Sequence, residues 1–334
     1  MTATSSCHLL FPIDPSKILT GFTTSPTISL PNVAHVSLDD KALGVHKAWN
    51  RTIHDVVVPP PGLPPNVSPT FSSNNNSNPD DQGRRQEAWL AHFPAGSINP
   101  NNKSAPPGGF GFYVHGPADF HSKLKTLAAR TGGWEVVMGY EAMFEQGWEW
   151  ALGGKLPGVY GGSGDSAYGC TGGRQTDRCR CFNLRLMWRQ GGQGELYTYL
   201  PNNPANTASL RSIPPKSIQH PDYGFSVGRG AWTFQPGRWT AVAERVKVNT
   251  IGNADGEIEV FIDGRSVILA KGLILRDEEA PDSHVQGLHF QTFFGGHLPE
   301  WASPKDQNAW FTSISGAILD PETASTGVHG HDEL

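Results

Sequence analysis

The chain has 334 residues, of which 37% are hydrophobic and 10% aromatic, so it is long enough to bury a sizeable core. Its 26 Lys and Arg against 31 Asp and Glu give a net charge of −5, and it has no long basic run, which argues against nucleic acid as a partner. No stretch approaches the ~18 consecutive apolar residues of a membrane-spanning helix, so we expect no membrane span.

Residues 1–84 precede the segment in which regular strands are predicted. Residues 1–56 have mixed character, and we expect a partly ordered N-terminal extension that contributes peripheral strands. The apolar run from Cys7 to Ile13 is short and has no basic segment before it, so we predict no signal peptide there. Residues 57–84 are rich in Pro, Asn and Ser and cannot bury much apolar surface, so we expect a disordered loop or linker.

A globular domain is expected over residues 85–322, followed by a flexible tail over 323–334. Abundant Gly and Pro favour short strands joined by turns, and one helix is predicted, at 117–130. Asp263-Gly264 lies between two alternating segments and predicts a tight hairpin. Strands are predicted at 110–115, 134–144, 182–189, 194–200, 238–248, 256–262, 265–275, 285–294 and 309–319. These elements predict an all-β fold, an antiparallel β-sandwich or jelly roll.

Two neighbouring strands carry the most informative polar residues. Residues 182–189 alternate strictly between apolar and other side chains, as in a strand with one face in the core. The face away from the core presents Asn183, Arg185, Met187 and Arg189. After the turn 190–194, one side of the next strand presents Glu195, Tyr197 and Tyr199. A five-residue loop would pair Arg185 with Tyr199, which predicts an exposed patch that gathers Asn183, Arg185, Tyr197 and Tyr199.

The chain has four cysteines, and the C-x8-C-x-C spacing of the last three does not match the paired ligands of structural zinc sites. A Cys170–Cys181 disulfide that closes a local loop is the better interpretation, although all four would stay thiols in the cytosol. The histidines are dispersed along the chain, so we expect no metal and no cofactor.

Two kinds of address signal favour the secretory pathway, that is, the extracellular space or the ER lumen. The C-terminal residues His331-Asp332-Glu333-Leu334 match an ER-retention signal. N-glycosylation sequons occur at Asn50, Asn66, Asn75 and Asn102. Chance is the alternative, because sequons arise often in sequence rich in Asn and Ser.

Several motifs together resemble polysaccharide lyase family 14, which contains alginate and glucuronan lyases. They are GGKLPGVYGG at 153–162, the cysteine-flanked CFNLRLMWR at 181–189, GELYTYLP at 194–201 and FQTFFGG at 290–296, followed by Trp301. The resemblance covers roughly residues 85–320, and the motifs in combination are far more specific than any one of them. It implies a concave substrate groove on the sheet, with the catalytic residues Lys155, Arg185, Tyr197 and Tyr199.

The residue types fit the chemistry that the resemblance implies. β-Elimination removes the C5 proton of a uronate, and negative charge then builds up on the adjacent carboxylate. Arg185 can bind that carboxylate through two hydrogen bonds, with Asn183 as a neutral donor. Tyr197 and Tyr199 can act as base and acid, with Lys155 as a further electrostatic or proton-transfer group. The sequence alone does not tell which of the two tyrosines is the base and which is the acid.

The resemblance therefore implies a metal-independent lyase that acts on an acidic polysaccharide as a monomer. His289, Gln291 and Trp148 are further candidates for substrate binding, although structural roles for them are an open alternative. The sequence departs from the family at one candidate residue, and this difference leaves a second function open. Family enzymes with alginate activity have Ser at the position of Asn183, so the alternative is a non-catalytic carbohydrate-binding β-sandwich.

Overall fold

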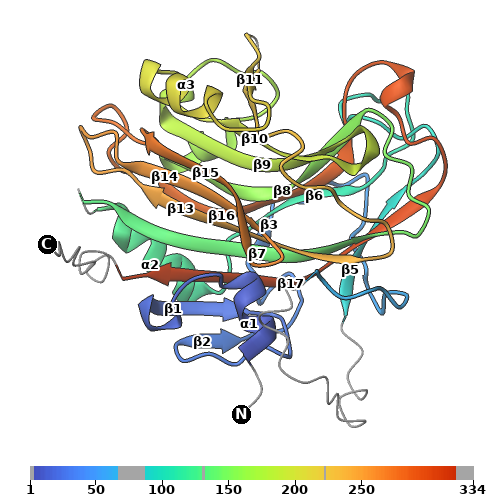
Figure 1. Cartoon of the computed structure of the whole chain (residues 1–334), viewed down its shortest axis with the longest axis horizontal. Coiled ribbons are helices and arrows are strands. Elements are labelled where there is room, and N and C mark those ends of the chain that lie inside the picture. The colour runs from blue at the N-terminus through green and yellow to red at the C-terminus, as the bar shows by residue number, and fades with distance from the viewer. Residues whose placement is uncertain (1–3, 67–86, 130–131, 222, 321–334) are drawn as a thin grey trace, which may run out of the picture.

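The computed structural model describes residues 4–66, 87–129, 132–221 and 223–320. Within them, two β-sheets stack as layers, with β8, β9 and β10 in one and β7, β17 and β1 in the other (Figure 1). The nine-stranded sheet comprises β15 (Arg265–Leu273), β14 (Gly256–Ile262), β13 (Trp239–Val248), β7 (Trp134–Phe144), β17 (Gln307–Leu319), β1 (Ile18–Thr23) and β2 (Val33–His35) in that order, with β5 (Ala88–Phe93) also paired to β17 and β4 (Val56–Val57) paired to β5. The eight-stranded sheet has the order β11 (Ile218–Gln219), β12 (Phe225–Val227), β10 (Gly194–Tyr199), β9 (Cys181–Arg189), β8 (Gly153–Gly162), β16 (His284–Phe294), β6 (Phe110–Val114) and β3 (Val45–His46).

The core lies between the two sheets, and the alternation of β9 shows how the sequence builds it. Phe182, Leu184, Leu186 and Trp188 are all buried in the core cluster, and the ring of Trp188 packs on that of Phe144 in β7 at a centroid distance of 5.7 Å. The intervening residues of β9 therefore face away from the core. Apart from β1 with β2, the named strands pair antiparallel in the described part of the chain, so the predicted antiparallel β-sandwich is confirmed.

The predicted hairpin and helix are also present. Asp263 and Gly264 both have positive φ angles, of 52° and 75°, as the tight turn between β14 and β15 requires. Helix α2 (Ala118–Ala128) lies within the predicted 117–130 and packs against β16. Two further helices were missed by the sequence analysis, α1 (Thr4–Leu10) and α3 (Pro204–Arg211). Of the helices in the described residues, none is long and apolar enough to cross a membrane.

Strand β8 is the main correction, because the sequence analysis predicted no strand over residues 153–162. In the structure it is buried along its whole length and lies between β9 and β16. The glycines are needed for close packing rather than for turns. A Cβ atom at Gly158 would collide with the carbonyl oxygen of Leu184, and one at Gly154 with the ring of Trp188.

The N-terminal segment is integrated into the nine-stranded sheet. Strand β1 pairs along β17, and α1 covers the outer face of this sheet. The apolar run that begins at Cys7 packs there through Leu10 and Phe11 against Val137 and Ala243. Most of the predicted loop 57–84, the predicted tail 323–334 and Asn75 lie outside the described residues. The predicted domain boundaries and the monomeric state stay predictions.

Candidate active site

A groove of about 820 Å³ lies on the face of the eight-stranded sheet that points away from the core. It crosses the sheet, because its floor takes side chains from neighbouring strands in spatial order. These are Ser226 of β12, Tyr197 and Tyr199 of β10, Arg185, Met187 and Arg189 of β9, Lys155 of β8, and Gln291 and Phe293 of β16. All four residues predicted to be catalytic therefore line one groove, together with Gln291.

The pairing of β9 with β10 differs from the predicted register. Tyr197 lies opposite Arg185, and Tyr199 lies opposite Asn183, so the predicted pair of Arg185 with Tyr199 is wrong by two residues. The reason is the position of the turn. Trp188 already pairs with Gly194, and the connecting residues 189–193 include Gly191 and Gly192 with positive φ angles. Because the shift is an even number of residues, the predicted side chains still share one face.

The predicted patch is mostly buried, with only Tyr197 partly exposed. Arg185 and Tyr199 are each only 3% exposed, and Asn183 is fully buried. The groove walls cover them, since the groove is also lined by Trp49, Arg51 and the segment 99–101 from the loops around the sheet. Sequence reasoning missed these rim residues, because they lie far from the strands in the sequence and follow no periodic pattern.

Arg185 is a buried cation without an acidic partner among the described residues. Its Nη1 donates a hydrogen bond to Oε1 of Gln291, and its Nε has no hydrogen-bond partner. Burial lowers the pKa of Arg185, although Tyr199 and Tyr113 favour its charged form. A guanidinium in this state is ready to bind an anion, because an unpaired buried N–H group costs free energy until a partner satisfies it.

Lys155 and the two tyrosines form a compact cluster beside Arg185. The Nζ of Lys155 lies 3.3 Å from the ring centroid of Tyr197 and 5.8 Å from that of Tyr199. Burial, and then the charges of Arg185 and Arg189, hold the pKa of Lys155 well below its ordinary value. Burial and the neighbouring Tyr199 raise the pKa of Tyr197, so its hydroxyl stays protonated at neutral pH.

The Cys170–Cys181 disulfide is confirmed, and it packs directly against Tyr199. The loop that it closes also brings in Arg178, whose Cζ lies 5.0 Å from the ring centroid of Tyr199. Arg178 is largely buried and donates hydrogen bonds to the carbonyl oxygens of Arg174 and Tyr223. Positive charge therefore flanks Tyr199 from outside the groove, a feature for which the sequence carries no pattern.

Asn183 and His289 are buried and do not line the groove, although they lie two residues from Arg185 and Gln291 on β9 and β16, on the same face of the sheet. The Nδ2 of Asn183 is 2.9 Å from Nδ1 of His289, and Oδ1 of Asn183 has no hydrogen-bond partner within the described chain. Burial, together with the charges of Arg185 and Lys155, holds the pKa of His289 well below its ordinary value, so the ring is neutral. The pair thus lies beside the groove, on the outer face of the eight-stranded sheet.

Trp148, predicted to bind substrate, instead lies in the core. Its ring packs on Phe93, Phe144 and Phe294, with centroid distances of 5.2, 5.0 and 5.6 Å. The correction has a simple cause: a large apolar ring next to a sandwich core gains more by burial between the sheets. Trp301, by contrast, does line the groove.

The sequons in the described residues lie at the surface. Asn50, Asn66 and Asn102 are exposed, and Asn50 also lines the rim of the groove. Glycosylation and the secretory location stay predictions.

Comparisons with known proteins agree with this fold. The family model described as polysaccharide lyase 14 matches residues 81–314. The crystal structure of the PL-14 alginate lyase from Aplysia kurodai superposes with a TM-score of 0.61 at 30% identity, covering 84% of this chain and 92% of that chain. Alginate lyase vAL-1 from Chlorella virus superposes with a TM-score of 0.54 at 19% identity, covering 83% and 93%, and supports the fold alone. A comparison with curated protein sequences gave no match.

Proposed function

This chain belongs to polysaccharide lyase family 14, and from that membership we propose that it cleaves a uronate-containing polysaccharide, of alginate or glucuronan type, by metal-independent β-elimination. One observation carries the proposal. The buried guanidinium of Arg185, which has no acidic partner among the described residues, lines the same groove as an amine and two phenols. The groove, at about 820 Å³, is large enough for several sugar rings.

In this proposal Arg185 binds the carboxylate of the uronate that reacts. Its unpaired Nε and its terminal nitrogens offer the planar fork that fits a carboxylate, and Gln291 fixes the guanidinium from one side. When the C5 proton leaves, negative charge spreads onto the carboxylate. The buried guanidinium stabilises that charge strongly, because few water molecules screen it.

Two proton transfers then complete the elimination. Tyr199 takes the C5 proton, because the guanidinium of Arg178 beside its ring has the sign of charge that stabilises a phenolate. Tyr197, which burial keeps protonated, donates its proton to the leaving glycosidic oxygen. Lys155 lies over the ring of Tyr197, and a bound uronate carboxylate favours its charged form, so it stabilises the bound substrate.

The ultraviolet spectrum of the products tests this function. The protein is incubated with polyglucuronate, polymannuronate and polyguluronate, and absorbance is followed in the near ultraviolet. Elimination creates a double bond conjugated to the carboxylate, so at least one polymer should give rising absorbance together with new reducing ends. New reducing ends without that absorbance would identify a hydrolase and contradict the proposal.

A non-catalytic carbohydrate-binding role is the second candidate, and the position of Asn183 favours it. Its amide is turned toward His289 and does not line the groove, and Asn183 is the position at which the sequence departs from the Ser that the family resemblance implies. Binding of a uronate polymer without any product, by absorbance or reducing ends, would support this role and contradict catalysis.

A further inference from the structure

A second group of cations lies at the β12 end of the groove, away from Arg185. The carboxylate of Glu195 is fully buried, and two arginines share it. Its Oε1 accepts a hydrogen bond from Nη2 of Arg189 at 2.5 Å. Its Oε2 accepts from Nε of Arg229 at 2.6 Å and from the hydroxyl of Ser226 at 2.7 Å.

The charges in this group do not balance. Burial favours the neutral form of Glu195, but the charges of Arg189 and Arg229 and the hydrogen bonds outweigh it and lower the pKa of Glu195. One carboxylate therefore faces two guanidinium groups, and the group keeps a net positive charge.

The excess positive charge faces the groove. Arg189, Ser226 and Arg229 line it, whereas Glu195 lies beneath them. The side chains of Arg189 and Arg229 are 13% and 28% exposed, and Nε of Arg189 is buried without a hydrogen-bond partner in the described chain. An arginine that served only to hold Glu195 would gain nothing from leaving this N–H unpaired.

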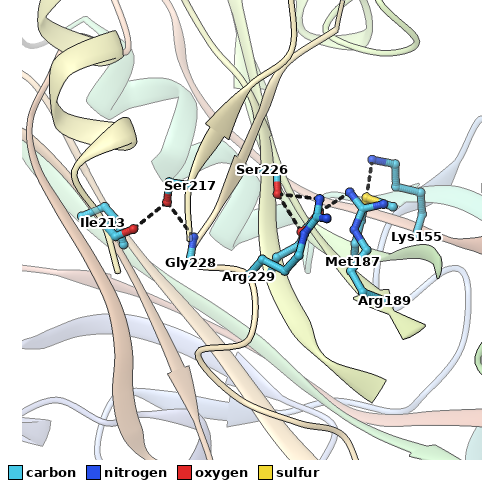
Figure 2. A network of polar contacts seen from close by, with 9 residues as sticks. Lys155, Met187, Arg189, Ile213, Ser217, Ser226, Gly228 and Arg229 are labelled. Atoms are coloured by element: carbon cyan, nitrogen blue, oxygen red, sulfur yellow. Dashed lines mark hydrogen bonds and ion pairs between the residues drawn. The ribbon is translucent and has the colours of Figure 1, made fainter. Parts of the chain in front are cut away.

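The backbone around Arg229 is held in place from several sides. Its N–H donates to the carbonyl oxygen of Lys216, and the next residue, Gly230, donates to that of Gly194. Figure 2 shows the preceding Gly228 bound to the hydroxyl of Ser217, with Arg229 and Arg189 side by side next to Lys155. Arg229 is thus a preorganised group that requires little ordering when a ligand binds.

We propose that Arg189 and Arg229 form a second carboxylate-binding subsite, which holds another uronate of the polysaccharide whose reacting uronate binds Arg185. This rests on the proposed function for the nature of the ligand. Arg185 and Arg189 are four residues apart on the same face of β9, so their Cα atoms are separated by ~13 Å. That separation places the two carboxylates on different sugar rings. The enzyme would therefore select chains rich in uronate over chains in which a uronate stands alone among neutral sugars.

Equilibrium binding to a protein that does not turn over its ligand tests the subsite. Calorimetric titration of the Tyr199→Phe variant with glucuronate and mannuronate hexasaccharides is compared with the Tyr199→Phe, Arg229→Gln double variant. The double variant lacks the charge-assisted hydrogen bond from Arg229 to the second carboxylate, so it should bind a hexasaccharide about 10- to 100-fold more weakly. Binding of the carboxyl-reduced hexasaccharide should not change, because it has no carboxylate for Arg229 to bind.

Matched controls separate charge from folding. Arg229→Lys keeps the charge but loses the planar fork, so it should weaken binding less than Arg229→Gln does. Arg211→Gln removes an exposed arginine of α3 that does not line the groove, and should leave binding unchanged. Equal affinities with and without Arg229, or no binding of either hexasaccharide, would overturn the subsite and leave the two arginines as partners of Glu195 only. The binding experiment tests the subsite without turnover. Its failure can therefore be distinguished from a failure of the ultraviolet assay, which tests the proposed elimination.

Discussion

Single residues in this protein show two ways of burying a positive charge. Arg245 is mostly buried, and three glutamates surround its guanidinium: Glu135, Glu257 and Glu259. Burial alone would lower the pKa of Arg245, but the hydrogen bonds from these glutamates raise it, so the charge is satisfied within the fold. Arg185 and Lys155 are buried without such partners, and the pKa of each is lowered. The difference supports the proposal that a ligand supplies the missing negative charge in the groove.

A cluster of histidines outside the groove predicts how stability depends on pH. The ring of His115 stacks between those of His46 and His121, with centroid distances of 3.8 and 3.9 Å. Burial lowers the pKa of His115 to about 3 and that of His121 to about 4. In the unfolded chain both titrate near ~6.5, so between about pH 6.5 and 4 unfolding takes up protons. The free energy of unfolding should therefore fall as the pH falls through this window.

Thermal denaturation between pH 7 and 4 measures this effect. The His121→Gln variant should be less sensitive to pH than the wild type, because one of the buried histidines that take up protons on unfolding is gone. His297 is exposed, so His297→Gln serves as the control and should keep the wild-type pH dependence. A His121→Gln protein whose melting temperature falls as steeply as that of the wild type would contradict the assignment.

Among the elements, the loop between β8 and β9 connects stability to the groove. Its disulfide joins Cys170 to Cys181 at the start of β9, and the loop supplies Thr171 and Gly172 to the groove lining and Arg178 to the ring of Tyr199. A covalent link in this position constrains the unfolded chain and holds one wall of the groove next to Tyr199.

Replacement of both cysteines, Cys170→Ser with Cys181→Ser, should lower the free energy of unfolding by ~3 kcal/mol, as expected for a short closed loop. It should also reduce kcat, because Arg178 is no longer held beside Tyr199. Urea unfolding and steady-state kinetics provide the two measurements. Cys179→Ser changes a free cysteine of the same loop and should leave both unchanged. Equal stability of the double variant and Cys179→Ser would show that the disulfide contributes nothing.

The sequence predicted the elements whose side chains follow a simple period. β7 and β14 have the predicted bounds, and the alternation of β9 placed Arg185 on the correct face. Alternation of apolar and polar residues did not reveal β8, because its close packing between β9 and β16 requires glycines, which carry no side chain to alternate. The register of β10 was wrong because it depends on φ angles at Gly191 and Gly192, which the sequence does not fix. Arg229 was missed because only the folded turn after β12 brings it to the groove.

At the scale of the whole molecule, the two sheets have different outer faces. The N-terminal segment with α1 covers part of the outer face of the nine-stranded sheet with an apolar cluster. The outer face of the eight-stranded sheet carries the polar groove instead. The covered sheet stacks on the eight-stranded sheet (Figure 1). The neighbouring strands β10, β9 and β8 of the latter carry Tyr197, Arg185 and Lys155 of the groove. Side chains placed on strands keep a more precise geometry than side chains placed on loops.

Turnover by the Tyr199→Phe variant tests most directly whether elimination takes place in this groove. The phenyl ring keeps the packing against the disulfide and Arg178 and loses only the hydroxyl. On the uronate polymer that the wild type cleaves, the rate of near-ultraviolet product formation should fall by about 10²- to 10⁴-fold, as for the loss of a general base, while the affinity for a hexasaccharide stays within about threefold. A folded Tyr199→Phe protein that forms the product at the wild-type rate would place the proton transfer elsewhere and contradict the proposed site.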